Sequence, residues 1–181
     1  MAMWDRIKDQ AKILQQAQGV RGSSGHGSGS GSGGGPKALL VKALKSQLTS
    51  VKAELKSGAY RDASMAMCAL VAAADGHVDP AERQHVESLI LGNDVLQNFP
   101  PDQLRQRFNK HVDLLAVNFQ QGKAEAMQDI AKAAKKQTEA RAVIQTGLVV
   151  AGADGFVAPA EEQVIREACS ALGLSPAEFS L

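Results

Sequence analysis

An internal repeat constrains this chain of 181 residues more than any other feature. The sequence ADGHVDPAE at residues 74–82 returns as ADGFVAPAE at residues 153–161, a constant offset of 79 residues. Each copy follows a strongly apolar stretch and precedes a segment with helical periodicity, so each predicts the same helix–loop–helix unit. We therefore expect a domain built from two related helical hairpins that pack with pseudo-two-fold symmetry.

The composition favours an all-α fold. Aromatic residues make up only 4% of the chain while 44% is hydrophobic, a mix that suits closely packed helices better than a β-sandwich. Short connections separate the helical patterns, which predicts a compact multi-helix bundle over residues 36–181. The expected helices cover about 36–57, 60–74, 80–91, 101–119, 123–135, 138–153 and 159–172, and Ser175 and Glu178 form a capping-box pattern for a last turn.

Residues 1–35 differ from the rest of the chain. Residues 1–21 predict a basic amphipathic helix, with one apolar stripe made of Trp4, Ile7, Ala11 and Leu14. Residues 22–35 are almost entirely Gly and Ser, typical of a flexible linker that spans roughly 20 Å. Two roles for the helix stay open: binding an anionic membrane surface or a partner, or docking on the protein's own core. The residues assigned to the first role are Trp4, Arg6, Ile7, Lys8 and Lys12.

Charge and cysteine content limit which partners and which cellular compartment are expected. The formal net charge is only +1, which gives no indication of a nucleic-acid partner. Cys68 and Cys169 lie in apolar stretches without a CxxC spacing, so we expect two buried thiols in a reducing cytoplasm. No secretory signal or membrane-spanning apolar run is apparent, and we expect a cytoplasmic protein, peripheral on the inner face of the plasma membrane where the basic helix binds it.

The repeated loop resembles the second half of an EF-hand calcium loop. In Asp-Gly-x-Val-x-x-x-Glu an oxygen ligand precedes a glycine that makes the sharp turn, and a glutamate closes the loop from the next helix. The opening carboxylate positions of an EF-hand are missing, because Val71 and Ala73 occupy them in the first copy and Val150 and Gly152 in the second. Each copy alone therefore supplies too few oxygens for the six to eight ligands of calcium.

Two half-loops together approach that number if they lie side by side. We therefore predict one weak site for Ca²⁺ or another divalent cation, and its predicted ligands are Asp75, Asp79, Glu82, Asp154 and Glu161. The alternative is that these residues only make turns and helix starts, with Asp79 as N-cap and Pro80 at the first helical position. Ala158 replaces that cap in the second copy although Glu161 remains, so a capping box does not explain both glutamates.

Enzyme activity is the competing class of function. The four histidines show no Ser/His/Asp or metal-triad spacing, and we expect each of them to be a solvated surface residue: His26, His77, His85 and His111. An aspartate and a glutamate of one loop would make a conceivable acid/base pair, but no substrate pocket is readable from the sequence. We expect a non-enzymatic protein, with a metal-free protein–protein adaptor as the alternative to a metal-binding scaffold.

Several segments together resemble the TerB family of bacterial tellurite-resistance proteins over Tyr60 to Leu181. The matching features are the paired Asp-Gly loops, the helix around Cys68, the ending SALGLSPAEF at residues 170–179, and the opening MWDRIK at residues 3–8. The Gly/Ser linker departs from the family pattern. The resemblance implies an all-helical fold, a role in tellurium resistance and stress response, and a metal-binding acidic surface. It also implies partners among the Ter proteins, both membrane-embedded and calcium-binding TerD-like ones, at the cytoplasmic face of the membrane.

Overall fold

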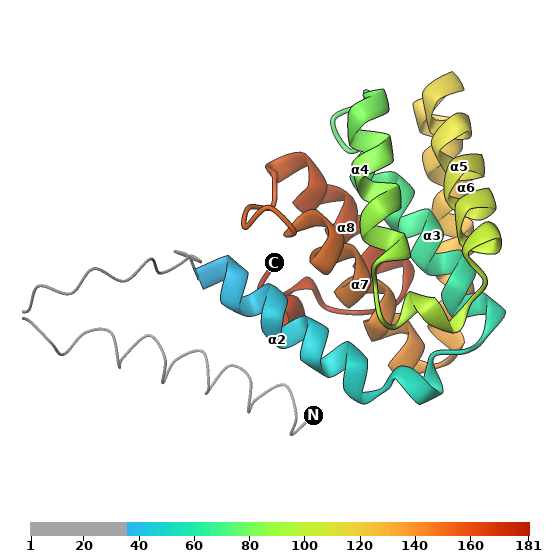
Figure 1. Ribbon diagram of the computed structural model, residues 1–181. Coiled ribbons are helices and arrows are strands. Elements are labelled where there is room, and N and C mark those ends of the chain that lie inside the picture. Colours follow the sequence, from blue (N-terminus) through green and yellow to red (C-terminus); the bar gives the residue numbers. More distant parts are fainter. Residues whose placement is uncertain (1–35) are drawn as a thin grey trace, which may run out of the picture.

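The computed structural model describes residues 36–181, and every regular element in that range is helical (Figure 1). The α-helices are α2 (Pro36–Ser50), α3 (Gly58–Ala72), α4 (Pro80–Leu91), α5 (Pro101–Val117), α6 (Phe119–Ala131), α7 (Gln137–Ala151) and α8 (Pro159–Ala171). Four 3₁₀ turns connect or follow them: η1 (Lys52–Glu54), η2 (Leu96–Asn98), η3 (Lys132–Lys135) and η4 (Pro176–Phe179). The all-α bundle is confirmed, whereas the predicted N-terminal helix and linker lie outside the described residues.

The internal repeat is visible in the helix boundaries. Helices α3 and α7 have the same length of 15 residues, and both the α3/α7 and the α4/α8 pairs begin at the offset of 79 that the sequence repeat has. The chain therefore contains two helix–loop–helix units of matching design. A pseudo-two-fold axis between them stays a prediction.

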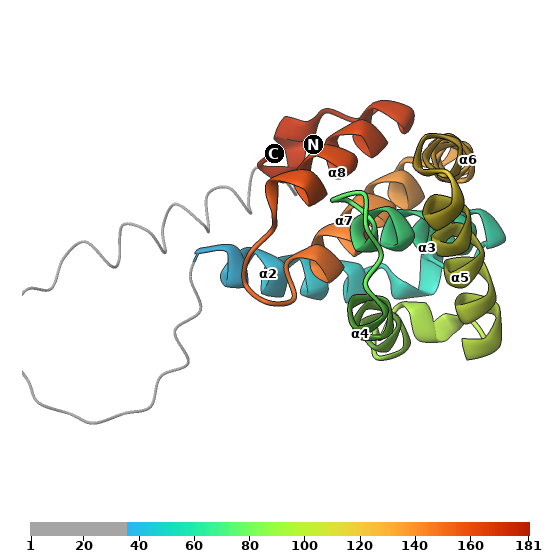
Figure 2. The ribbon, with the colours of Figure 1, turned by 90° about the horizontal axis from the view of Figure 1, so that it is seen from above.

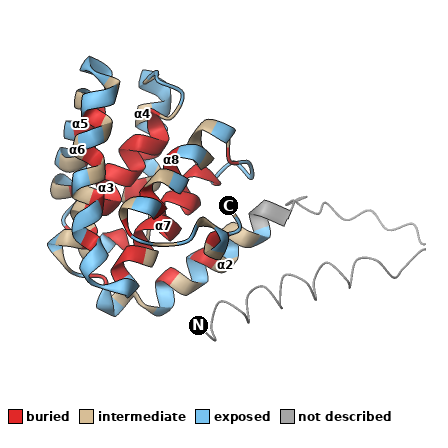
Figure 3. Ribbon diagram, turned by 180° about the vertical axis from the view of Figure 1, so that it is seen from behind, coloured by how far each residue is buried: buried red, intermediate tan, exposed pale blue. Residues whose placement is uncertain are grey.

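Helices α3 and α7 form the centre of the core (Figure 3). Eleven residues of α3 and twelve of α7 are buried, which fits sequences that are apolar nearly all round. The two helices approach closely because Gly147 has no side chain, and a Cβ there would lie 2.7 Å from Cγ of Met67. Tyr60 and Thr146 join them through a buried hydroxyl–hydroxyl hydrogen bond of 2.9 Å.

The other helices cover this pair. Helices α5 and α6 pack on α3, and α2 lies along α7, where it buries Leu44 and Leu48 (Figure 1). The predicted end of the first helix near Gly58 was wrong, because α2 stops at Ser50 and Gly58 instead begins α3. Ser57 decides this start, since its side chain accepts a hydrogen bond from the backbone N–H of Tyr60 and caps α3.

The boundary between α5 and α6 also differs from the prediction. The helix that was predicted to continue to Phe119 ends before Asn118. The side chain of Asn118 accepts a hydrogen bond from the backbone N–H of Gln121 and caps α6, which begins four residues earlier than predicted. At the last turn, Ser175 makes no side-chain cap, so the predicted capping box there was wrong. None of the helices in the described part of the chain has the length and apolarity needed to cross a membrane.

Candidate cation site

The two Asp-Gly loops have the same backbone conformation. Gly76 and Gly155 adopt φ values of 86° and 82°, a left-handed conformation that glycine adopts without the steric cost of a Cβ atom. The amide of Gly76 donates to the carbonyl oxygen of Ala73 at 2.9 Å, and the amide of Gly155 donates to that of Gly152 at the same distance. The repeated sequence therefore produces a repeated turn, as the predicted role of its glycines requires.

In the first loop two of the predicted ligands support the backbone. Asp75 accepts a hydrogen bond from the backbone N–H of His77 at 2.9 Å, and Asp79 accepts one from Ala81 at 2.7 Å as the N-cap of α4. Each uses one carboxylate oxygen, Oδ1, for this bond. The three acidic residues of this loop, Asp75, Asp79 and Glu82, are exposed to solvent.

In the second loop the glutamate takes over the capping role. Ala158 has no side-chain oxygen that could cap α8, and Glu161 Oε2 accepts from the backbone N–H of Ala158 at 2.8 Å. Glu161 therefore has the glutamate role of a capping box although Ala158 has no capping side chain, while no such bond is made by Glu82, so a capping box accounts for one of the two glutamates. Asp154, the remaining predicted ligand, is exposed in the turn.

The two loops are neighbours. His85 Nε2 on α4 lies 3.9 Å from Asp154 Oδ1 in the second loop. Burial raises the pKa of Glu161, and the charges of Glu82 and Asp75 from the first loop raise it further together with that of Asp154. Figure 2 shows the two connections, α3 to α4 and α7 to α8, on neighbouring parts of the bundle. The condition that a shared site requires, two adjacent half-loops, is thus met.

Negative charge is in excess between the loops. Burial raises the pKa of Glu82, the carboxylates of Asp75 and Asp79 raise it further, and His85 opposes them. Glutamates whose ionised form is disfavoured in this way are the groups that a cation would neutralise. Carboxylate oxygens are also the donors that hard divalent cations prefer.

The donors do not form a ready-made metal centre. Among residues 36–181, no three His, Cys, Asp or Glu side chains are grouped in a way that could hold a metal ion. Four of the five predicted ligands are exposed, and only Glu161 is half-buried. The donor set fits a divalent cation in chemistry and charge, and its side chains would have to converge to bind one.

Most of the chain, including the helices that carry the two loops, also matches a known family model. The model described as Tellurite resistance protein TerB matches residues 61–181, which include both Asp-Gly loops. This chain belongs to the TerB family. No curated protein and no solved structure matches it. The predicted family resemblance, which began at Tyr60, is confirmed, while α2 and residues 1–35 lie before the matched region.

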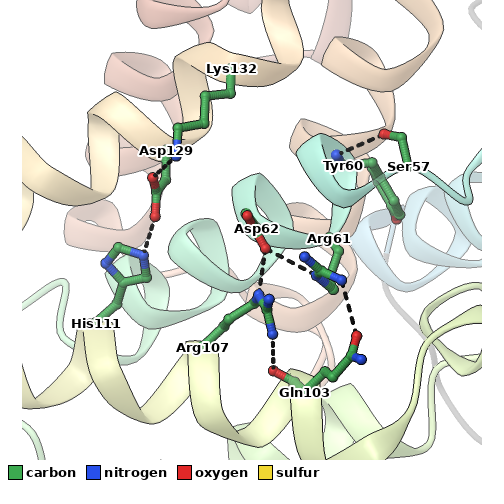
Figure 4. A network of polar contacts seen from close by, with 9 residues as sticks. All are labelled: Ser57, Tyr60, Arg61, Asp62, Gln103, Arg107, His111, Asp129 and Lys132. Carbon is green, nitrogen blue, oxygen red and sulfur yellow. Dashed lines mark hydrogen bonds and ion pairs between the residues drawn. The ribbon is translucent and has the colours of Figure 1, made fainter.

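The TerB domain has a second polar cluster that sequence reasoning missed (Figure 4). His111 is only 3% exposed, so its prediction as a surface residue was wrong. Its Nε2 lies 2.8 Å from Asp129 Oδ2, and Lys132 Nζ lies 2.7 Å from the other oxygen of Asp129. Burial would raise the pKa of Asp129, but the hydrogen bonds from Lys132 and His111 outweigh it and lower that pKa. His111 extends the apolar stripe of Leu104 and Phe108 at helical spacing, which is the signal that predicts its burial.

The cluster continues toward α3. Asp62 accepts from Arg61 Nε at 3.0 Å and from Arg107 Nε at 2.6 Å, and Arg61 also donates to the side chain of Gln103 at 3.0 Å. These bonds connect α3 with α5, while the His111–Asp129 bond connects α5 with α6. Each charged side chain has at least one partner, although the buried Nδ1 of His111 has none among the described residues, and the bonds explain the cluster best as a clamp between three helices.

Burial favours the protonated form of the two thiols of the TerB domain. Cys68 and Cys169 are both buried, as predicted. Burial raises the pKa of the Cys68 thiol to about 12 and that of Cys169 to about 11, where the charge of Glu178 adds to it. Because the thiolate is the nucleophile and the metal ligand, a raised pKa disfavours both roles for these cysteines at neutral pH.

Proposed function

We propose that this TerB-family chain is a non-enzymatic tellurite-resistance and stress-response scaffold that binds a divalent cation weakly between its two Asp-Gly loops. The observation that carries the proposal is the adjacency of the loops, in which His85 Nε2 lies 3.9 Å from Asp154 Oδ1. Burial raises the pKa of Glu161, and the carboxylates of both copies add to this. Family membership supports the link to tellurite resistance.

Calcium is the cation that suits these donors best. It accepts six to eight oxygen ligands in flexible geometry, whereas magnesium requires a near-ideal octahedron. The residues that would hold it are Asp75, Asp79, Glu82, Asp154 and Glu161, together with backbone carbonyls and water. Because the loops lack the opening carboxylates of an EF-hand and their side chains are not converged, we expect a dissociation constant of roughly 10⁻⁵ to 10⁻³ M.

The scaffold would act with other Ter proteins at the cytoplasmic face of the membrane. Family membership supports this assignment, with a membrane-embedded partner and calcium-binding TerD-like proteins as the expected partners. A weak cation site on an exposed acidic surface fits such a role, since a partner's oxygens would complete the coordination that this chain leaves incomplete.

A calcium titration followed by amide NMR and thermal unfolding tests the proposal. Calcium should shift the amides of both loops and raise the Tm of the native chain. The double variant Asp75→Asn/Asp154→Asn should lose both effects and keep its helical fold. A charge-matched control, Asp102→Asn/Glu125→Gln, changes two acidic residues that make no ion pair within residues 36–181, and it should respond like the native chain.

The competing function is a metal-free protein–protein adaptor. It is favoured by the hydrogen bonds that Asp75, Asp79 and Glu161 make to the backbone, since these give three of the five carboxylates a role in the fold without a cation. Calcium stabilisation that is equal in the native chain and the Asp75→Asn/Asp154→Asn variant, or absent from both, would reject the cation site and leave the adaptor.

A further inference from the structure

A groove between α2, α4 and α7 has no role in the proposed cation site. It encloses about 200 Å³, and its floor is apolar, formed by Leu48, Leu89, Val95, Val149 and Val150. Its rim is polar and includes Lys45 and Thr49 on α2, Ser88 on α4 and Asp94 after α4. An apolar floor with a polar rim accommodates an amphipathic side chain that has one apolar body and one polar tip.

Trp4 is such a side chain, and it is the only tryptophan of the chain. It begins the apolar stripe that continues through Ile7, Ala11 and Leu14, a spacing that repeats along one helical face. We propose that residues 2–18 dock as an amphipathic helix on the α2–α4–α7 groove, with Trp4 as the anchor in the cavity. Of the two roles predicted for this segment, the groove favours docking on the protein's own core over binding to a membrane or a partner.

The connection is long enough for this docking. The groove residues Lys45 and Thr49 lie nine and thirteen positions after Pro36, which places them roughly 14 to 20 Å along α2. Residues 19–35 form a Gly/Ser-rich connection whose composition gives an end-to-end distance of roughly 20 to 25 Å. The segment therefore reaches the groove without any change in the described helices.

Size favours this groove over a second cavity near the start of α2. That cavity, lined by Leu40, Val41 and Leu148 among others, encloses only about 50 Å³ and leaves little room for an indole ring. Asp94, on the rim of the larger groove, is exposed and makes no ion pair within residues 36–181, so it is available to the basic residues of the segment. Those residues are Arg6, Lys8 and Lys12.

Tryptophan fluorescence of the full chain tests the proposal, because Trp4 is its only source. Docked Trp4 should emit at shorter wavelength than an exposed indole and resist quenching by acrylamide. Ser88→Arg places a long cationic side chain on the groove rim, and it should move the emission to longer wavelength and increase quenching several-fold.

A matched control separates docking from general damage. Ser170 on α8 is also an exposed helix serine, and like Ser88 it donates a hydrogen bond to the carbonyl oxygen four residues earlier. Ser170→Arg should therefore leave the Trp4 emission at its native value. Trp4 emission that is equally exposed in the native chain and in Ser88→Arg would overturn the proposal.

Amide NMR gives a second test that does not depend on a groove variant. Trp4→Ala should shift the amide of Gly92 in the groove, because it removes a ring current, and leave that of Gly122 between α5 and α6 unchanged. An unmoved Gly92 amide would contradict docking. So would a Trp4 emission shift that appears only when vesicles rich in anionic lipid are added, since the segment would then be a membrane-binding element.

Discussion

Glu82 and Glu161 occupy the same position of the repeat, yet their surroundings differ because of a single neighbour. Asp79 caps α4 by accepting from the amide of Ala81, and Glu82 is left facing the carboxylates of Asp75 and Asp79. In the second copy Ala158 does not cap, and Glu161 turns back to the free N–H of Ala158. One substitution between the two copies thus decides which glutamate gives one oxygen to the backbone and which keeps both oxygens available to a cation.

Replacing Glu82 by Gln should have opposite effects with and without calcium. The raised pKa of Glu82 means that its ionised form destabilises the folded state at neutral pH. Without calcium, Glu82→Gln should raise Tm by roughly 1–3 °C at pH 7, since partial burial and repulsion between exposed carboxylates are together worth only a few tenths of a kcal/mol. With saturating calcium the variant should be less stable than the native chain, because it has lost a ligand.

The stability difference between Glu82→Gln and the native chain should depend on pH. The penalty of the ionised group is present above the raised folded pKa and disappears as the pH falls through it toward the ordinary glutamate value of about 4.3. The stability difference should therefore vanish near pH 4, as scanning calorimetry at several pH values will show. Glu125→Gln on α6 serves as the control, and a Glu82→Gln gain that persists unchanged at pH 4 would refute this electrostatic origin.

Residue roles were predicted where the local sequence determines them. The glycine turns and the Asp79 cap depend only on neighbours within a few positions, and the structure has both. His85 beside Asp154 was missed because this contact joins two loops that are far apart in sequence. Its signal was its position one turn after Glu82 on the same face of α4.

At the scale of the elements, one glycine sets the distance between α5 and α6. A Cβ on Gly122 would lie 2.6 Å from the backbone nitrogen of Leu115, so the two helices touch backbone to backbone at this point. The backbone of a packed helix yields less easily than a side chain. The close crossing also holds Asp129 of α6 against His111 of α5.

Gly122→Ala should therefore destabilise the protein although alanine is the better helix former. We expect a loss of about 1–3 kcal/mol in the free energy of unfolding from overpacking, which exceeds the gain in helix propensity. Urea unfolding measures it. In the control Gly58→Ala, the nearest atom to the new Cβ is Nη2 of Arg61 at 3.2 Å and no backbone atom from outside its own helix lies within 4 Å, so stability should change less than in Gly122→Ala. Equal stability of the two variants would contradict the close crossing.

Element boundaries were predictable where a strong start signal exists. The helix expected at residues 80–91 has those bounds in the structure, because Asp79 and Pro80 mark its start and Gly92 follows its end. The end of α2 was not predictable from periodicity, since Val51 and Leu55 continue the apolar spacing past the last α-helical residue, Ser50. The Ser57 cap starts α3 at Gly58, so the chain leaves the helical path of α2 before that point although the apolar spacing continues.

At the scale of the whole molecule, the core extends beyond the region that the family model matches. The match begins at residue 61, but α2 before it packs on α7 and buries Leu44 and Leu48. Helix α2 is thus part of the same hydrophobic core.

Leu48→Ala should be strongly destabilising for this reason. Leu48 is 1% exposed, and its truncation should cost roughly 2–5 kcal/mol and lower Tm by roughly 5–15 °C. Leu39 on the same helix is 45% exposed, and Leu39→Ala should change Tm by little. Similar, small effects of both substitutions in thermal unfolding would show that α2 is not part of the core.

The two buried cysteines have a consequence for how this protein can be followed as it opens. Cys68 lies in the first helix–loop–helix unit and Cys169 in the second, so each half of the repeat carries one thiol that reagents reach only after local or global opening. Because both side chains belong to one continuous core, their alkylation should report the same opening free energy, that of the whole domain. The rates at which the two thiols are alkylated would therefore report whether the two halves of the duplicated fold open together.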